Sequence, residues 1–188
     1  MGAEYELKYK ATEAVFAAIS GPWQEIAMET TYYDTPNGAL SARRCTLRRR
    51  LENGVSICTI KTPGTDGVRG EWEVECDSII AAIPMLCKLG CSEELDALCA
   101  DGLIPVCGAR FTRKIQLLEL DGCCAELAFD NGILFGNGKE VPLCEVELEL
   151  KSGKRGALDA FAKDFAAKHH LSPEKKSKFA RALALCEE

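Results

Sequence analysis

Charged side chains occupy every second position in a short segment near the amino end of the chain. Glu4, Glu6 and Lys8 alternate there with Tyr5 and Leu7. Because successive side chains of a β-strand point to opposite faces, the three charged groups would share one face, about 7 Å apart. Carboxylate oxygens bind hard divalent cations, whereas Lys and Arg bind phosphate oxygens. Such a face is suited to hold a metal ion next to a phosphate group.

The same alternation recurs in four further segments, and within each of them most charges have one sign. The segments carry Arg48 and Arg50; Thr59 and Lys61; Arg69, Glu71, Glu73 and Glu75; and Glu145, Glu147, Glu149 and Lys151. An ordinary sheet with one face in water accounts for any one segment alone. It does not account for rows of like charges, which repel one another across neighbouring strands. The pattern predicts a closed or strongly curled sheet that gathers its charged faces around a metal–polyphosphate complex.

Breaker residues and apolar periodicity place these segments in an α+β domain with many antiparallel strands. Strands are expected at residues 3–10, 26–33, 46–52, 55–61, 70–76, 106–120, 123–131, 133–135 and 140–151. Helices are expected at residues 14–20, 78–101 in two pieces, 158–169 and 173–186. Asn-Gly or Asp-Gly pairs predict tight turns at residues 53–54, 121–122, 131–132 and 137–138. The 188 residues suit a single domain, 1–188, with C-terminal helices at about 157–187.

The composition limits the partners of the protein. The net charge is −6, so the molecule as a whole repels nucleic acid and anionic membranes, and neither is an expected partner. A bound polyanion must therefore meet a local concentration of Lys and Arg. No apolar run is long enough to span a bilayer and no secretory signal is visible, so a cytoplasmic location is expected.

The eleven cysteines and two histidines are not expected to bind metal. The cysteine count is odd, no Cys-x-x-Cys pair occurs, and most cysteines lie in apolar strand-like runs, where a thiol packs as a small hydrophobic group. His169 and His170 are adjacent at a helix end, which favours a role as charge partners of the helix terminus. The expected metal ligands are therefore carboxylates.

Eight motifs, in order along nearly the whole chain, resemble those of the CYTH family of triphosphate tunnel metalloenzymes. They are Glu4-x-Glu6-x-Lys8, Leu47-Arg48-x-Arg50, Thr59-x-Lys61, Arg69-x-Glu71-x-Glu73, Arg113, Asp130-x-Gly132, Glu145-x-Glu147-x-Glu149, and Ser177-Lys178-x-x-Arg181. The resemblance implies an eight-stranded antiparallel β-barrel that forms a tunnel flanked by helices. It also implies a requirement for Mg²⁺ or Mn²⁺, with one or two ions left open.

The resemblance assigns roles to individual residues. The implied catalytic set is Glu4, Glu6, Lys8, Arg48, Arg50, Lys61, Arg113 and Lys178. Metal would be held by Glu4 and Glu6 with one or two of Glu145, Glu147 and Glu149, of which Glu147 is favoured. Phosphate would be bound by the six cations of the catalytic set and by Arg181, with Glu71, Glu73 and Asp130 in support. A glutamate not bound to metal would orient or deprotonate the attacking water.

Simpler explanations remain open for two of the lysines, and one arginine serves as an internal control. Lys8 could form an internal salt bridge with Glu6, and Lys178 could lie on a solvated helix face. Arg49 lies between Arg48 and Arg50, so it is expected to point to the opposite face of the strand.

The leading functional expectation is hydrolysis of inorganic tripolyphosphate to diphosphate and phosphate. A nucleoside or thiamine triphosphatase, a class IV-type adenylate cyclase and a non-catalytic polyphosphate-binding module remain alternatives. An RNA triphosphatase is less attractive because the chain is acidic. The low aromatic content, 7%, weakly disfavours a stacked base or thiazole. The expected partner is a small anion, tripolyphosphate or a nucleoside triphosphate, and a homodimer is left open.

Overall fold

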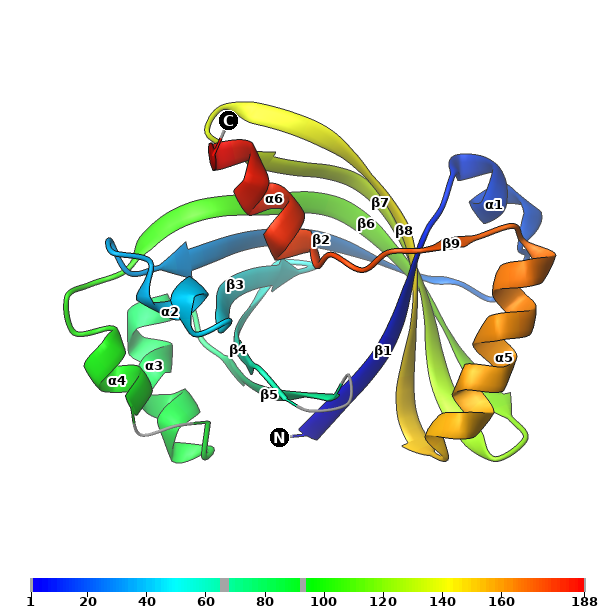
Figure 1. The fold of residues 1–188 in the computed structure, drawn as a ribbon, viewed down its shortest axis with the longest axis horizontal. Coiled ribbons are helices and arrows are strands. Elements are labelled where there is room, and N and C mark those ends of the chain that lie inside the picture. Colours follow the sequence, from blue (N-terminus) through cyan, green and yellow to red (C-terminus); the bar gives the residue numbers. More distant parts are fainter. Residues whose placement is uncertain (1, 65–67, 92–93, 188) are drawn as a thin grey trace.

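Eight antiparallel strands form a closed barrel, drawn in Figure 1. The computed structural model describes residues 2–64, 68–91 and 94–187. The strands are β1 Gly2–Lys10, β2 Gln24–Asp34, β3 Thr46–Glu52, β4 Val55–Thr62, β5 Val68–Glu75, β6 Ile104–Leu120, β7 Cys123–Gly136 and β8 Lys139–Gly153. Their order is β5-β4-β3-β2-β6-β7-β8-β1, and an additional pairing of β5 with β1 closes the circle. The predicted α+β fold with an eight-stranded barrel is confirmed.

Strand β1 is the point of closure. Its first half pairs with β5, with Glu4 opposite Arg69. Its second half pairs with β8, with Glu6 opposite Glu149 and Lys8 opposite Glu147. A two-residue strand, β9 Ser172–Pro173, also pairs with the end of β1. The charged face of the amino-terminal segment is thereby enclosed between two strands that are distant in sequence.

Helices cover the outer face of the barrel and its open end. They are α1 Glu13–Ala18, α2 Ala39–Ala42, α3 Ile79–Lys88, α4 Glu94–Leu98, α5 Arg155–Lys168 and α6 Lys178–Glu187. Since the cavity-lining charged residues of β1, β3, β4, β5 and β8 face inward, the apolar residues that alternate with them face outward and need a cover. Helix α5 covers β1, β7 and β8, whereas α3 covers β4 and β5. No helix within these described ranges is long and apolar enough to cross a membrane.

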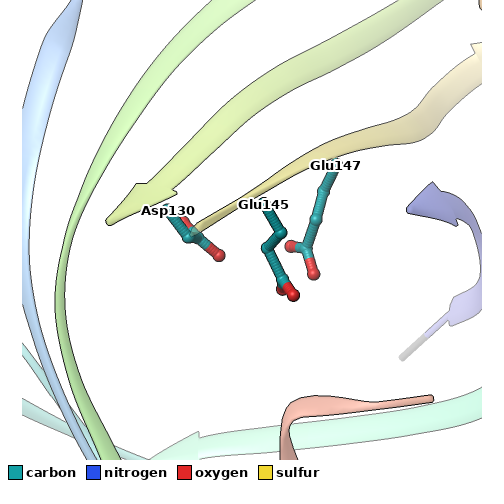
Figure 2. Close-up of side chains that lie close together, drawn as sticks. All are labelled: Asp130, Glu145 and Glu147. Atoms are coloured by element: carbon teal, nitrogen blue, oxygen red, sulfur yellow. The ribbon is translucent and has the colours of Figure 1, made fainter. Parts of the chain in front are cut away.

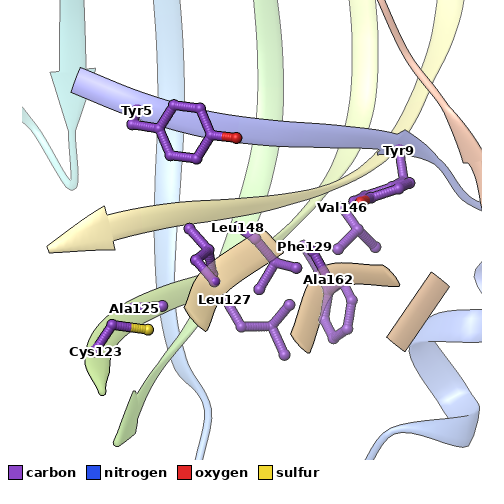
Figure 3. Close-up of a cluster of buried hydrophobic side chains, with 10 residues drawn as sticks. Tyr5, Tyr9, Cys123, Ala125, Leu127, Phe129, Val146, Leu148 and Ala162 are labelled. Atoms are coloured by element: carbon purple, nitrogen blue, oxygen red, sulfur yellow. The ribbon is translucent and has the colours of Figure 1, made fainter. Parts of the chain in front are cut away.

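The hydrophobic core beneath α5 shows this arrangement. Tyr5, Phe129 and Leu148 point outward from β1, β7 and β8 into one cluster, as Figure 3 shows. Leu158 of α5 is fully buried in the same cluster, and the Tyr5 hydroxyl donates a hydrogen bond of 2.6 Å to Asp159. The apolar half of the β1 alternation therefore anchors a helix, while the charged half faces the barrel interior.

The expected turn at residues 131–132 is wrong, because β7 runs through it without interruption. Gly132 lies opposite Phe111 of β6 and Leu143 of β8. A β-carbon at Gly132 would lie 2.2 Å from the carbonyl oxygen of Arg110. Glycine is thus required here by the close approach of a neighbouring strand and not by a turn.

The expected helix at residues 173–186 begins later than predicted, at Lys178. The preceding residues are held to β1, since Pro173 pairs with Tyr9 and the Glu174 amide donates to the Lys8 carbonyl at 2.8 Å. The Ser177 hydroxyl accepts a hydrogen bond of 3.1 Å from the Ala180 amide, as a helix N-cap does. The short helix α2 was not expected, and α1 ends at Ala18 instead of residue 20.

Replacing Gly132 with alanine is expected to destabilise the barrel by about 1–3 kcal/mol, because the new methyl group overlaps the β6 backbone. Thermal unfolding followed by circular dichroism measures this loss. Gly156→Ala is the matched control, since Gly156 lies in α5 and a methyl group added there would meet no atom within 4 Å; the control should be neutral or stabilising. Equal melting temperatures for the two variants would contradict the close approach described here.

Candidate active site

The barrel encloses a cavity of about 330 Å³ whose wall is densely charged. Its eight acidic residues are Glu4, Glu6, Glu52, Glu71, Glu73, Glu126, Glu147 and Glu149. Its seven basic residues are Lys8, Arg48, Arg50, Lys61, Arg113, Lys151 and Lys178. The two signs nearly balance, so the wall suits a ligand that itself carries both signs, such as a cation bound to a polyanion.

Strand alternation decides which side chains reach the cavity. Arg48 and Arg50 of β3 line it. Arg49 points to the other face, where its Nε donates to the Ser56 hydroxyl at 2.9 Å. The orientation predicted for these three arginines is confirmed.

A row of carboxylates crosses three strands on one side of the cavity. Glu6 lies opposite Glu149, which in turn lies opposite Glu126. Like charges in such positions are destabilising unless a cation compensates them. Lys8 lies 2.7 Å from Glu6, and Lys151 lies 2.9 Å from Glu149. Burial raises the pKa of Glu149, and although Lys151 opposes the rise, the nearby carboxylates add to it. The row therefore retains a surplus of negative potential, as a cation site requires.

Glu4 extends this acidic region towards the basic side of the cavity. Both of its carboxylate oxygens accept hydrogen bonds of 2.6 Å from the Lys61 ammonium. Lys61 is also 3.4 Å from Glu71. A single lysine thus links carboxylates of β1 and β5 where the barrel closes.

Arg48 and Arg50 form a cationic region with few anions of their own. Arg48 is 3.5 Å from Glu71, and Arg50 contacts Glu52. The Nε atoms of both arginines are buried and have no hydrogen-bond partner among the described residues. Burial and the charge of Arg48 lower the pKa of Arg50 to about 10. A buried donor without a partner is costly, so this region is complete only with an anion.

Asp130, Glu145 and Glu147 bring their carboxylates together, as Figure 2 shows. One oxygen from each lies within 4.8 Å of the others. Lys178, the first residue of α6, lies 2.7 Å from Asp130 and 2.8 Å from Glu147, and it also contacts Glu145. This acidic trio is therefore already bound by a buried ammonium group.

Two arginines complete the charge balance of the acidic trio. Arg113 donates two hydrogen bonds to Asp130, at 2.7 and 2.6 Å, and one to Glu147 at 2.5 Å. Arg181 contacts Glu145. Three carboxylates thus face three cations. Burial opposes the charged form of Glu147, but Lys178 and Arg113 outweigh it and lower the pKa of that group.

Burial has the opposite outcome for the pKa of Glu145, which like Asp130 is fully buried. Its side chain is fully buried, which raises its pKa to about 7 in spite of Lys178. The neighbouring Glu147 carboxylate adds to the rise. The acidic trio fixes α6 against the barrel wall through ion pairs that little water can screen.

The structure places twelve of the fifteen predicted site residues on the cavity wall. These are Glu4, Glu6, Lys8, Arg48, Arg50, Lys61, Glu71, Glu73, Arg113, Glu147, Glu149 and Lys178. Asp130, Glu145 and Arg181 do not line this cavity and pair with other residues instead. The solvated-face alternative for Lys178 is wrong, since its side chain is only 10% exposed. The salt bridge considered for Lys8 does form, although Lys8 also lines the cavity.

Sequence reasoning missed several wall residues, among them Glu52, Glu126 and Tyr32. The position of Glu126 could have been predicted from the strand register. Counting pairs outward from the turn at residues 137–138 places Glu126 opposite Glu149. The expected turn at residues 131–132 interrupted that count. Tyr32 follows the alternation of β2 but carries no charge that would have drawn attention to it.

A closed barrel with a charged interior and helices on its outer face is the architecture of triphosphate tunnel proteins. Residues 2–183 match the CYTH domain, and the chain belongs to the CYTH domain family. Over 132 residues it is 31% identical to the inorganic triphosphatase of Haemophilus influenzae. That match covers 69% of this chain but only 38% of the relative, so more than half of that protein lies outside the match.

Solved structures show the same fold at low sequence identity. A protein from Hippeastrum, described as an adenylyl cyclase candidate with a dominant triphosphatase activity, superposes with a TM-score of 0.67 at 20% identity. The superposition covers 99% of this chain and 97% of that one. A protein from Pyrococcus horikoshii OT3 gives a TM-score of 0.65 at 21% identity, covering 97% and 99% of the two chains.

Lys178→Met is expected to destabilise the protein by about 3–5 kcal/mol, because it leaves the buried acidic trio without its central cation. Chemical denaturation measures the loss. Lys175→Met is the control, since Lys175 is exposed and should change stability by less than about 0.5 kcal/mol. Without Lys178 the pKa values of Glu145 and Glu147 rise, so the variant loses stability as pH rises through them. Its deficit should therefore be smaller at pH 5 than at pH 8; a deficit independent of pH would contradict this role.

Proposed function

We propose that this chain is a metal-dependent triphosphatase whose preferred substrate is inorganic tripolyphosphate, cleaved to diphosphate and phosphate. The observation that carries the proposal is the pair Arg48 and Arg50, whose buried Nε atoms have no partner among the described residues and which line a charged cavity. Family membership and the inorganic triphosphatase relative support the same reaction class. A cavity of about 330 Å³ is at the small end of ligand sites, which favours a compact inorganic anion.

Glu4, Glu6 and Glu149 are the residues best suited to hold Mg²⁺ or Mn²⁺. These ions prefer oxygen ligands and combine a few carboxylates with substrate oxygens and water. The three glutamates face the cavity, and their lysine partners lie on the same wall and can turn to phosphate. A cation in the acidic trio would have to displace Lys178 and leave a buried ammonium unpaired, which is costly. This cost favours Glu149 over the Glu147 first expected.

A bound metal would neutralise charge on the substrate and acidify the attacking water. The remaining work falls to the chain's own residues, which position the substrate and neutralise its oxygens. Arg48, Arg50 and Lys61 bind the non-bridging oxygens of the phosphate chain. Water attacks the terminal phosphorus, the bond to the bridging oxygen breaks, and that oxygen leaves with the diphosphate. Glu126, the next carboxylate beyond Glu149, accepts the proton from the water.

One part of the wall favours a second candidate function. Ile26, Met28, Phe111 and Ile115 line the cavity along β2 and β6. Such an apolar strip would suit the organic group of a nucleoside or thiamine triphosphate. Inorganic tripolyphosphate remains preferred because charged groups make up most of the wall.

The reaction is tested by phosphate release from tripolyphosphate, ATP and thiamine triphosphate with Mg²⁺ or Mn²⁺, with cyclic AMP measured in parallel. We expect the highest kcat/KM with tripolyphosphate and no turnover in EDTA. Dominant cyclic AMP formation would replace the proposal with a cyclase. Thermal stabilisation by tripolyphosphate without turnover in either metal would replace it with a binding module.

Arg48→Ala and Arg50→Ala are each expected to lower kcat/KM for tripolyphosphate by about 100-fold or more, because each removes a preorganised charge from the transferring phosphoryl group. Arg49→Ala is the matched control from the same strand and should stay within about threefold of the wild type, since Arg49 faces away from the cavity. Steady-state kinetics on folded variants makes the comparison. Equal losses of kcat/KM in all three variants would contradict the assignment of Arg48 and Arg50 as the phosphate-binding residues of this strand.

A further inference from the structure

A second cavity of about 520 Å³ adjoins the tunnel between α2, the start of β3 and α6. The two cavities share Lys8, Thr46, Ser177 and Phe179 as wall residues. We call the second cavity the vestibule; its further basic residues are Arg44, Arg69, Lys175 and Lys176. Since the shared residues belong to both walls, the vestibule and the tunnel are neighbours at these residues.

The vestibule differs from the tunnel in charge. Five cations line it against one described carboxylate, Glu187, and none of the eight tunnel glutamates takes part. Arg44, Arg69, Lys175 and Lys176 form no ion pair with any residue in the described ranges. The tunnel wall, by contrast, nearly balances its charges. Positive potential is therefore concentrated outside the tunnel, next to one of its ends.

The basic segment at residues 174–177 is fixed in place. The Glu174 amide donates to the Lys8 carbonyl at 2.8 Å, which ties the segment to β1. The Lys176 amide donates to the Glu174 carboxylate at 2.9 Å, and that carboxylate lies 3.7 Å from Arg181. Lys175 and Lys176 thus stand on a backbone held by the same ion-pair network that fixes α6.

A concentrated positive field matters because the protein carries a net charge of −6. A polyanion approaching the surface is repelled by most of it and attracted by the vestibule. Local fields of this kind raise association rates by about 10- to 1,000-fold, and they weaken with ionic strength. On the proposed function, the substrate is such a polyanion, and it must enter a closed barrel by an open end.

We propose that the vestibule is the entrance for the anionic substrate: an outer binding site in which Arg44, Arg69, Lys175 and Lys176 capture a linear polyphosphate before it passes Lys8 into the tunnel. Its lysine ammonium groups and arginine guanidinium groups bind the non-bridging phosphate oxygens. It contributes to capture and not to the chemical step. This inference rests on the proposed function for its substrate.

The test is a charge reversal, Lys175→Glu/Lys176→Glu, compared with Lys163→Glu/Lys168→Glu. The control pair is exposed on α5, on the outer face of the barrel, and changes the net charge equally. At low ionic strength the vestibule variant should lose about tenfold or more in kcat/KM for tripolyphosphate with kcat within about twofold. The loss should disappear near 0.5 M salt, where screening shortens the reach of surface charges to a few ångströms.

Three outcomes would overturn the proposal: no loss, an equal loss in the control, or a loss that salt does not reduce. Arg44→Glu, on a different element, repeats the test should the double variant fold poorly. Calorimetric affinity for tripolyphosphate, measured in EDTA at the same ionic strengths, makes the same comparison without turnover. A wild type that binds but does not hydrolyse would refute the proposed reaction alone, whereas unchanged affinity in the variants would refute the vestibule alone.

Discussion

The concentration of fifteen ionisable side chains inside one small barrel is the constraint on which the rest of this structure depends. Charges removed from water must be compensated by one another, by a ligand or by both. The strands that supply these charges turn their apolar halves outward, which inverts the usual arrangement of a sheet around a core, whereas β2 and β6 also contribute apolar residues to the cavity wall. The helices that cover Phe129 and Leu148 are therefore a direct consequence of the charged interior.

The charged side chains inside the barrel are not equally neutralised by partners. This difference separates charges with a structural role from charges with a functional role. The acidic trio is matched by Lys178, Arg113 and Arg181 in a nearly dry environment and joins α6 to the barrel. Arg48 and Arg50 retain unpartnered nitrogens. The cations of the first group are all ion-paired with its carboxylates, although the Nε of Arg181 also lacks a hydrogen-bond partner in the described part of the chain. Arg48 and Arg50 have fewer anions around them, and an anionic ligand would complete their region.

The sequence allowed the charged faces and the opposite orientations of Arg48 and Arg49 to be predicted, because a strand's period of two is a local property. The number of strands, eight, followed from the family resemblance, since the local pattern divided β7 into two segments. The sequence-based prediction was wrong at Gly132. The Asn-Gly pair predicted a turn, but the glycine allows a neighbouring strand to approach closely. The sequence could not show that Glu145 and Arg181 pair with each other away from the cavity wall, because this depends on where α6 docks. Nor could it reveal the vestibule, whose residues come together only when residues 41–46 meet α6.

The pairing of β1 with β5 and β8 also bears on how the protein folds. Glu6 and Glu149 are neighbours in the barrel although most of the chain lies between them in sequence. Contacts of such high sequence separation are slow to form, since the entropy of closing the chain must be overcome first. Partly folded chains thus hold the metal-ligand candidates apart. A cation that binds Glu4, Glu6 and Glu149 together would bind only the closed barrel and so shift the folding equilibrium towards it.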